Sequence, residues 1–463
     1  MRFIQYIPLA SVASALVITE AEVFQTIEKS GKQLLETTQN VLDNALGRVA
    51  NSAKTVGDNV YERIHNAGCD VESWLEGSPF LEELEEDPHH PPHHGPPGHH
   101  KPPHHGPPDH HKPPHHGPHH PPHHGGKPNL TVYELISKSK YTTKLAKLIN
   151  EYDDLVEALN GTKANYTVFA PTDAAFEKIP EHAHKPSKEF LKKLLTYHVS
   201  DDFYPAGRVL HSYTIPTLYT PDDLGHAQRL TVRVTLKGPA INFYARLVAV
   251  NIFGTNGVIH GIDSILVPPP RVVDIIDLLP GEFSTLELAL GKTGLLEKFN
   301  STDYPHEGGT FFAPSNFAFK KLGPRINAFL FSKYGQKYLK ALLEYHVVVN
   351  QTLYTDAFYD ATSIEEAVTD RPPYYHYDLP TALGKDLAVD VARYGPFVSI
   401  RINGFSRVTV HDGVASDGVI QVVSDVLIPP KNAASGEEVW TGEEMSVEEF
   451  KARFDVEEDN AEL

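Results

Sequence analysis

The residues best suited to chemistry in this chain are its 27 histidines. Many of them stand as pairs between prolines and glycines in residues 87–128. Neutral imidazole is a ligand for Zn²⁺, Cu²⁺ and Ni²⁺, and closely spaced pairs offer many ways to assemble a ligand set. The candidate metal ligands are His89, His90, His93, His94, His99, His100, His104, His105, His110, His111, His115, His116, His119, His120, His123 and His124.

Three roles for this tract are open: metal buffering or sensing, a pH-responsive spacer, and a plain linker. A flexible tract selects weakly among metals because nothing fixes the coordination geometry. The formal net charge is −19 with histidine neutral. Because free imidazole titrates near pH 6.5, charging the histidines would make the net charge positive near pH 5. Proline and glycine exclude a packed core here, so we predict a disordered linker. Zn, Cu or Ni are the metals that this linker could bind, and no other cofactor is expected.

Motifs of catalysis are absent from the sequence. It has no Gly-rich phosphate loop, no G-x-S-x-G elbow, no H-E-x-x-H and no Cys/His metal spacing. Adjacent acids such as Asp153 and Asp154 occur, but spacing alone does not place two carboxylates in different buried environments. We therefore predict that the protein is not an enzyme, with an unrecognised hydrolase as a remaining alternative. The negative charge and the lack of a basic stripe argue against a nucleic-acid partner.

The elements that would have to position any site occur twice along the chain. The stretch at 165–176 returns at 308–319, and the stretch at 256–269 returns at 417–430. A third match, 194–199 against 342–347, lies between them. Three matches in the same order and at domain-sized separation indicate a tandem duplication, so each copy should have its own core.

Each copy combines helices with a run of short strands. Apolar residues at helical spacing predict helices over 143–159 and 190–199, whereas a period of two over 230–243 predicts strands. Asn256-Gly257 is a hairpin turn signal that the second copy repeats. Helices that lead into hairpin-linked strands predict the α+β class.

The repeated T-x-F-A-P-[TS]-[DN]-x-A-F and [ND]-G-V-I stretches resemble the two signature boxes of the fasciclin (FAS1) domain family, over about residues 129 to 430. The resemblance implies two tandem FAS1-like domains, each a β-sandwich wedge with flanking helices. It also implies secreted or surface-attached modules that mediate adhesion, usually without catalysis. The signature residues are Thr167, Phe169, Ala170, Pro171, Thr172, Asp173, Phe176, Asn256, Gly257, Val258, Ile259, His260, Thr310, Phe312, Ala313, Pro314, Ser315, Asn316, Phe319, Asp417, Gly418, Val419 and Ile420.

These signature residues are predicted to be architectural. The phenylalanines belong in the core, and Thr172 and Asp173 suit the start of a helix. A Tyr-His pair lies between the boxes of each copy, at Tyr197, His198, Tyr345 and His346. It resembles the Tyr-His motif implicated in integrin binding by animal FAS1 proteins. The leucines and valines around each pair also suit a packed helix end, so an adhesion epitope and a hydrogen-bonded core element are both open, and we favour the core element.

The chain begins with a segment that resembles a secretory signal. Five sequons for N-glycosylation follow, at Asn129, Asn160, Asn165, Asn300 and Asn350. The predicted order is a signal peptide (1–21), a helix-prone leader (22–86), the His/Pro/Gly-rich linker (87–128), FAS1 domain 1 (129–269), FAS1 domain 2 (270–430) and an acidic tail (431–463) with a helical piece at 446–454. The leader could be a partner or membrane-surface helix, or a loosely helical stalk, which we favour because its polar face lacks a Lys/Arg excess.

Cys69 is the only cysteine, so no internal disulfide can form, although a Cys69-linked dimer is open. The lone cysteine, the abundant Tyr and Phe and the style of the tract are typical of a fungal protein. No GPI anchor or transmembrane helix is expected. We predict a non-enzymatic, secreted or cell-surface adhesion protein, with the vacuole also open, whose partner is a surface glycan, a glycoprotein or a lipid surface. The alternative is a metal- or pH-responsive binding protein that uses the His-rich tract.

Overall fold

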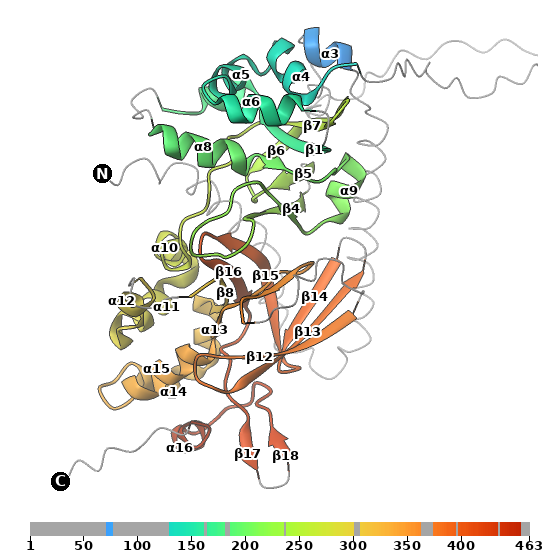
Figure 1. The fold of residues 1–463 in the computed structure, drawn as a ribbon. Helices are drawn as coiled ribbons and strands as arrows, with labels where there is room; N and C mark the ends of the chain where they lie inside the picture. Colours follow the sequence, from blue (N-terminus) through green and yellow to red (C-terminus); the bar gives the residue numbers. More distant parts are fainter. Residues whose placement is uncertain are drawn as a thin grey trace, which may run out of the picture.

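The structure, a computed structural model, describes residues 71–76, 129–161, 164–180, 186–235, 238–300, 306–362, 374–394, 397–433 and 436–454. It shows two consecutive domains in which helices pack on a mixed sheet, which is the α+β architecture expected from the sequence (Figure 1). The signal segment, most of the leader, the His-rich linker with all its candidate ligands, and Cys69 lie outside the described residues.

Domain 1 is built on one seven-stranded sheet with the order β2-β1-β7-β6-β5-β4-β3. Its strands are β1 (Tyr166–Pro171), β2 (Val199–Ser200), β3 (Thr214–Pro216), β4 (Arg229–Thr235), β5 (Gly238–Ile241), β6 (Ala245–Gly254) and β7 (Gly257–Ile262). Its helices are α4 (Val132–Lys138), α5 (Thr143–Ile149), α6 (Asp153–Asn160), α7 (Asp173–Glu177), α8 (Lys188–Tyr197) and α9 (Ala206–His211).

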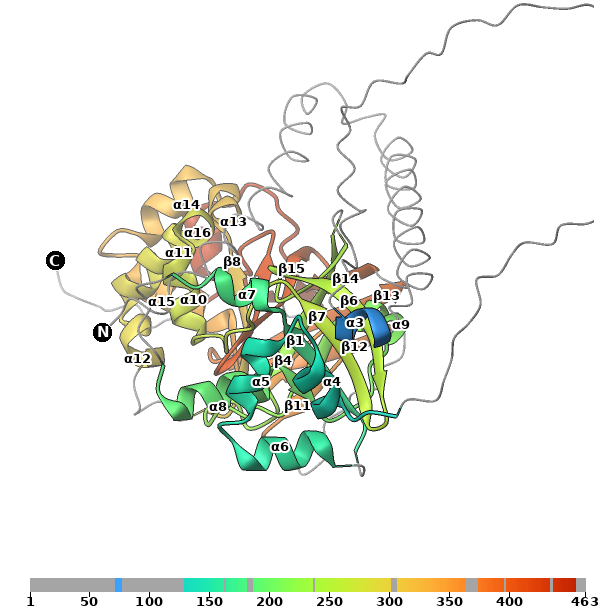
Figure 2. The same ribbon diagram turned by 90° about the horizontal axis from the view of Figure 1, so that it is seen from above.

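Domain 2 repeats this plan in a sheet with the order β12-β13-β14-β15-β16-β8-β9. Its strands are β8 (Gly309–Pro314), β9 (Val347–Val349), β12 (Tyr374–Pro380), β13 (Asp386–Tyr394), β14 (Phe397–Ile402), β15 (Ser406–Ala415) and β16 (Gly418–Val423). Two separate two-stranded sheets are formed by β10 (Gln351–Leu353) with β11 (Phe358–Asp360) and by β17 (Lys431–Ala433) with β18 (Gly436–Glu438). Its helices are α10 (Val272–Leu278), α11 (Pro280–Thr293), α12 (Leu295–Asn300), α13 (Asn316–Lys321), α14 (Gly323–Leu330), α15 (Gln336–Tyr345) and α16 (Val447–Lys451). Figure 2 shows most of these helices grouped to one side of β8.

The two signature boxes of each copy form neighbouring parallel strands at the centre of the sheet. β1 pairs with β7 and β8 pairs with β16, whereas the other strand pairs within the described residues are antiparallel. Alternation along β1 places Val168 in the core beneath the helices and Phe169 in the core on the other face of the sheet. A Cβ at Gly257 would lie 2.1 Å from the carbonyl oxygen of Tyr166, so this start of β7 requires glycine.

Both domains recruit chain from beyond the predicted boundaries. Helix α3 (Val71–Glu76), from the leader, inserts Trp74 into the domain 1 core, where its side chain is fully buried. The indole Nε1 of Trp74 donates to the carbonyl of Leu135 at 3.3 Å. At the other end, α16 forms within the expected 446–454 piece, with Ser446 as its N-cap, and Phe450 is fully buried in the domain 2 core. The leader and the acidic tail therefore each contribute a helix to a folded domain.

Replacing Trp74 with alanine is expected to destabilise domain 1 by about 3 kcal/mol. The substitution removes a buried indole, and the short helix α3 can then detach instead of leaving a closed cavity, which keeps the loss at the lower end of the usual range. Thermal unfolding of the full chain measures the effect. Glu76→Ala, an exposed change on the same helix, is the control, and equal midpoints for the two variants would show that α3 is not docked.

Candidate functional site

The polar signature residues cap helices, although not always the helices that follow them. Asp173 accepts the backbone N–H groups of Thr143 and Lys144 at 3.3 and 2.8 Å, so it caps the neighbouring helix α5. Asn316 binds the first two turns of α11 instead: its Oδ1 accepts the N–H of Thr285 at 2.8 Å, and its amide donates to the carbonyls of Pro280 and Gly281 at 3.2 and 3.1 Å. Thr172 occupies the N-cap position of α7 but makes no side-chain cap bond. The predicted cap at Asp173 therefore joins two helices that are distant in sequence.

His260 and its counterpart Gln421 show that the buried polar position of the second box is structural. Nε2 of His260 lies 2.8 Å from the carbonyl oxygen of Tyr204, and the ring stacks on Phe169. Nε2 of Gln421 donates to the carbonyl of Leu353 at 2.9 Å. Burial lowers the pKa of His260 to about 4, so the ring is neutral at physiological pH.

The Tyr-His pairs are buried at the ends of α8 and α15. Nδ1 of His198 lies 2.8 Å from the carbonyl oxygen of Leu194, and its Nε2 accepts the N–H of Leu266 at 2.9 Å. These contacts define the neutral imidazole with its proton on Nδ1. Burial lowers the pKa of His198 to about 4. Tyr197 is fully buried and accepts a hydrogen bond from Asn242 at 2.7 Å.

The second pair repeats this geometry. His346 contacts the carbonyl oxygen of Leu342 at 2.7 Å and accepts the N–H of Leu427 at 2.9 Å. Tyr345 is fully buried. Each histidine thus ties the end of a helix to the last part of the repeated stretch that carries the second signature box. Neither pair reaches the surface in this conformation, so a role as an adhesion epitope would require the domain to open.

Replacing His346 with alanine is expected to lower the free energy of unfolding of domain 2 by about 3 kcal/mol. The change leaves a buried carbonyl and a buried N–H without their partner and removes packed ring atoms. Urea unfolding of the full chain measures the loss. His211→Ala is the matched control, because His211 contacts the carbonyl oxygen of Gly207 in the same i−4 pattern but is exposed. An effect no larger than that of the control would contradict the proposed role of His346 in holding the end of α15.

Three of the predicted glycosylation sites, Asn129, Asn160 and Asn165, are exposed. Asn350 is half-buried, has a φ of 64° and accepts the N–H of Glu307 through Oδ1 at 2.9 Å. The side chain of Asn300 lies outside the described part. Among the described residues, no three or more His, Cys, Asp or Glu side chains are grouped as metal ligands. None of the described helices combines the length and the hydropathy that a membrane span needs.

A buried polar contact joins the two domains. The carboxylate of Asp356, in domain 2, accepts the N–H groups of Tyr213 and Thr214 in domain 1 at 2.9 and 2.8 Å. The guanidinium of Arg229, whose side chain is 4% exposed, lies 3.8 Å from the same carboxylate and donates to the hydroxyl of Tyr359 at 2.7 Å. Because the guanidinium is buried, the carboxylate is only 13% exposed and both groups are hydrogen-bonded, the contact fixes the orientation of one domain on the other.

Strand β15 extends the same interface. The hydroxyl of Thr231 in β4 donates to the carbonyl of Asp412 at 2.6 Å, and Gln228 donates to the carbonyl of Ala415 at 2.7 Å. The fully buried carboxylate of Asp412 accepts from His411 at 2.8 Å. Burial would raise the pKa of Asp412, but the hydrogen bond from His411 and the charge of Arg233 hold this pKa at about 2. Sequence patterns did not single out these residues, because each looks like an ordinary surface polar residue.

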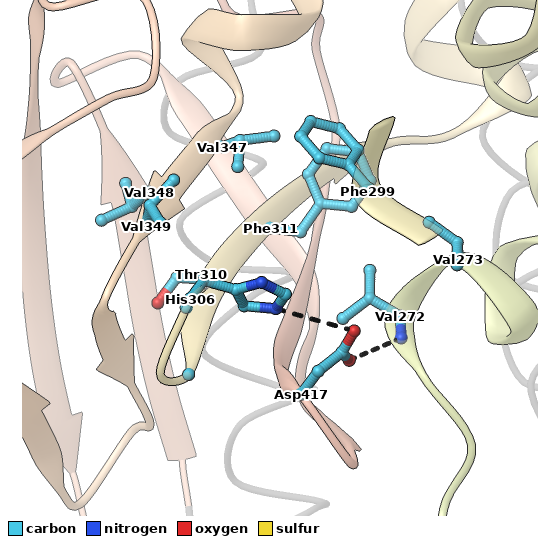
Figure 3. A pocket seen from close by; sticks show the side chains of 12 residues that line it. Val272, Val273, Phe299, His306, Thr310, Phe311, Val347, Val348, Val349 and Asp417 are labelled. Atoms are coloured by element: carbon cyan, nitrogen blue, oxygen red, sulfur yellow. Dashed lines mark hydrogen bonds and ion pairs between the residues drawn. The ribbon is translucent and has the colours of Figure 1, made fainter. Parts of the chain in front are cut away.

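One pocket of the described structure lies in domain 2 (Figure 3). It lies between the start of α10, the end of α12 and the edge of the sheet at β8 and β9, and has a volume of about 60 Å³. Its walls are mostly apolar, and a carboxylate and an imidazole provide the polar groups. The lining residues used below are Val272, Phe299, His306, Phe311, Val349 and Asp417.

Asp417 organises the polar side of this pocket. Its Oδ1 accepts the N–H of Val272 at 2.8 Å, and its Oδ2 accepts from Nε of Arg271 at 3.2 Å. The Nε2 of His306 lies 3.9 Å from Oδ2 (Figure 3). Asp417 was assigned from the sequence to a hairpin turn in the second signature box. Its side chain also reaches the pocket, which the turn pattern did not indicate.

The fold and its buried signature residues define a tandem α+β protein whose two halves share one topology. The family model described as "Fasciclin domain" matches the chain twice, over residues 140–268 and 281–429. These matches cover more than half of the chain, and the protein therefore belongs to the fasciclin domain family.

Several known proteins are similar to this chain. The aurofusarin biosynthesis cluster protein S of Gibberella zeae is 30% identical over 331 residues, which cover 67% of this chain and 80% of that protein. Fasciclin-1 of Schistocerca americana is 28% identical over 200 residues, or 41% of this chain and 29% of that protein. A solved FAS1 domain pair from the insect cell adhesion molecule Fasciclin I covers 62% of this chain and 97% of its own, with 18% identity and a TM-score of 0.32.

Proposed function

We propose that this protein is a non-enzymatic extracellular or cell-surface binding protein that acts through its two fasciclin domains. Proteins with fasciclin domains are cell-adhesion and extracellular proteins. The observation that carries the proposal is the buried contact between Asp356 and Arg229, because it presents two homologous domains in one fixed relative orientation. A fixed pair can engage two copies of a repeated surface ligand at once, which raises avidity without new contacts. A wall glycan, a glycoprotein and a lipid surface are the partner classes proposed.

Binding of the full chain to β-glucan and chitin particles, to a mannosylated glycoprotein and to anionic vesicles tests this function. We expect saturable retention on one of these surfaces. Retention should fall at least tenfold for Asp356→Ala, which frees the domains from each other. A soluble monovalent fragment of the same ligand should bind a single domain of the variant and of the parent chain with equal affinity. Lack of saturable retention on all the surfaces would overturn the proposal.

The same assay distinguishes binding through the fasciclin domains from the alternative, a metal- or pH-responsive binding protein. Deletion of residues 87–128 should leave retention unchanged if the tract is a spacer. Retention that disappears with this deletion, or with a chelator, would favour the His-rich tract as the working part. The tract lies outside the described residues, so this alternative rests on the sequence alone.

A second candidate function is a part in the biosynthesis of a small molecule. It is favoured by the relative from Gibberella zeae, which is named for the aurofusarin biosynthesis cluster and matches over 80% of its length. Expression of this chain in a Gibberella zeae strain that lacks that protein tests the idea. Restored aurofusarin would support a shared function, and an unchanged deficiency despite secretion of the chain would count against it.

A further inference from the structure

The two domains differ at the position that closes one end of the sheet. In domain 1, Asn256 accepts the N–H of Val132 through Oδ1 at 2.9 Å, and its amide donates to the carbonyls of Leu159 and Gly161 at 2.8 and 2.6 Å. The amide thus draws the end of α6 against the sheet.

Domain 2 has Asp417 at the same position, and a carboxylate cannot donate these bonds. It keeps the first contact, to the N–H of Val272, and it accepts from Arg271 in place of donating to the end of α12. The apolar neighbours are correspondingly less covered. Val132 and Leu159 are 0% and 2% exposed in domain 1, whereas their counterparts Val272 and Phe299 are half-buried. The exchange of one amide for one carboxylate accompanies a change from a closed end to an open pocket.

We propose that this pocket of domain 2 is a binding site for a neutral small molecule that inserts an aromatic or branched apolar group and donates a hydroxyl to Asp417. The half-buried Phe299 and Val349 and the buried Phe311 offer apolar contact to the inserted group. Asp417, which is 6% exposed, keeps acceptor capacity beyond its two bonds. The volume of about 60 Å³ is smaller than the roughly 150 Å³ of a cavity that encloses benzene, so an aromatic ring enters only in part and the rest of the ligand extends into solvent.

The charges around the pocket favour a neutral ligand. An anion placed on the carboxylate side would meet Asp417, and a cation would meet the guanidinium of Arg271. A hydroxyl avoids both costs and gains a hydrogen bond to a charged acceptor. This inference is independent of the surface binding proposed above, because it concerns one domain and a soluble ligand.

Phenol, benzene and benzoate are suitable probes, since they share a ring and differ only in the donor and the charge. Titration of the isotope-labelled full chain followed by NMR should show phenol shifting signals of β8, β9 and the start of α10, with a Kd on the order of 1 mM for so small a ligand. Benzene should bind about tenfold more weakly, because it cannot bond to Asp417. Benzoate should not bind.

Two variants locate the site. Asp417→Asn, which reproduces the residue that closes this end in domain 1, should weaken phenol and benzene alike, because its amide can draw the end of α12 over the pocket as Asn256 draws the end of α6. Val349→Phe should fill the pocket and abolish the binding of both probes, whereas Leu288→Phe, at a position that is 53% exposed on α11, should change neither. Equal affinity for phenol and benzene, binding of benzoate, or shifts that persist in Val349→Phe would overturn the proposal.

Discussion

Replacing Asp356 with alanine is expected to destabilise the protein by about 3 to 5 kcal/mol and to release the two domains from their fixed orientation. The substitution leaves the guanidinium of Arg229 buried without its counter-charge and removes the acceptor for two N–H groups of domain 1. Breaking a buried ion pair on one side is costly for this reason. Urea unfolding measures the loss of stability, and small-angle scattering measures the larger mean separation of the domains.

Two comparisons make this result specific. Asp378→Ala removes a carboxylate whose side chain is 67% exposed, also in domain 2, and should cost less than about 0.5 kcal/mol. The double change Arg229→Met with Asp356→Leu should cost less than Asp356→Ala alone, because no unpaired charge stays buried. If the double variant is the less stable one, the contact does not act as an ion pair.

The second large effect expected is a loss of stability in mild acid. Burial lowers the pKa of His198, His226, His260 and His346 to about 4 in the folded protein. The same side chains titrate near 6.5 when the chain is unfolded. Between these two pH values the unfolded chain binds protons that the folded chain does not, so the free energy of unfolding falls as the pH falls. Each histidine contributes at most about 1.4 kcal/mol per pH unit within this window.

Urea unfolding at pH 7.5, 6.5, 5.5 and 4.5 checks this expectation. Stability should be constant above about pH 6.5 and fall steeply below it. His260→Gln carries the residue that domain 2 uses at this position, so it should keep the hydrogen bond to Tyr204 and remove one titrating group. We expect a slope that is smaller by up to about 1.4 kcal/mol per pH unit. A flat profile for the parent chain, or an unchanged slope in this variant, would contradict the assignment.

An exposed histidine provides a contrast of opposite sign. The hydrogen bond that Nδ1 of His376 donates to the carboxylate of Asp390, at 2.8 Å, raises the pKa of His376, whose side chain is 44% exposed. A raised pKa contributes stability at low pH that is lost as the pH rises through the folded value. Solvent screening keeps this contribution small. The buried histidines therefore set the direction of the pH response of the described domains.

The sequence by itself determined the duplication, the α+β class and the fasciclin family. These features are local or repeated, since box residues, turn residues and periodicity can be recognised without knowing what they contact. It also indicated the helix at 446–454 and favoured a core role for the Tyr-His pairs, because apolar flanks indicate a packed helix end. It did not show that Trp74 and Phe450 complete the cores. Both residues lie outside the repeated stretches from which the domain boundaries were predicted.

Only the tertiary structure decided how the copies are joined and where they differ. Arg229 and Asp356 are far apart in sequence, and each reads as a solvated charge until the folded domains bring them together in a buried contact. Asn256 and Asp417 align as equivalent turn residues, yet one closes an end of its domain and the other lines a pocket. The physical reason is that a side chain's environment, and with it its hydrogen bonds and its pKa, depends on residues that the chain places beside it only when folded.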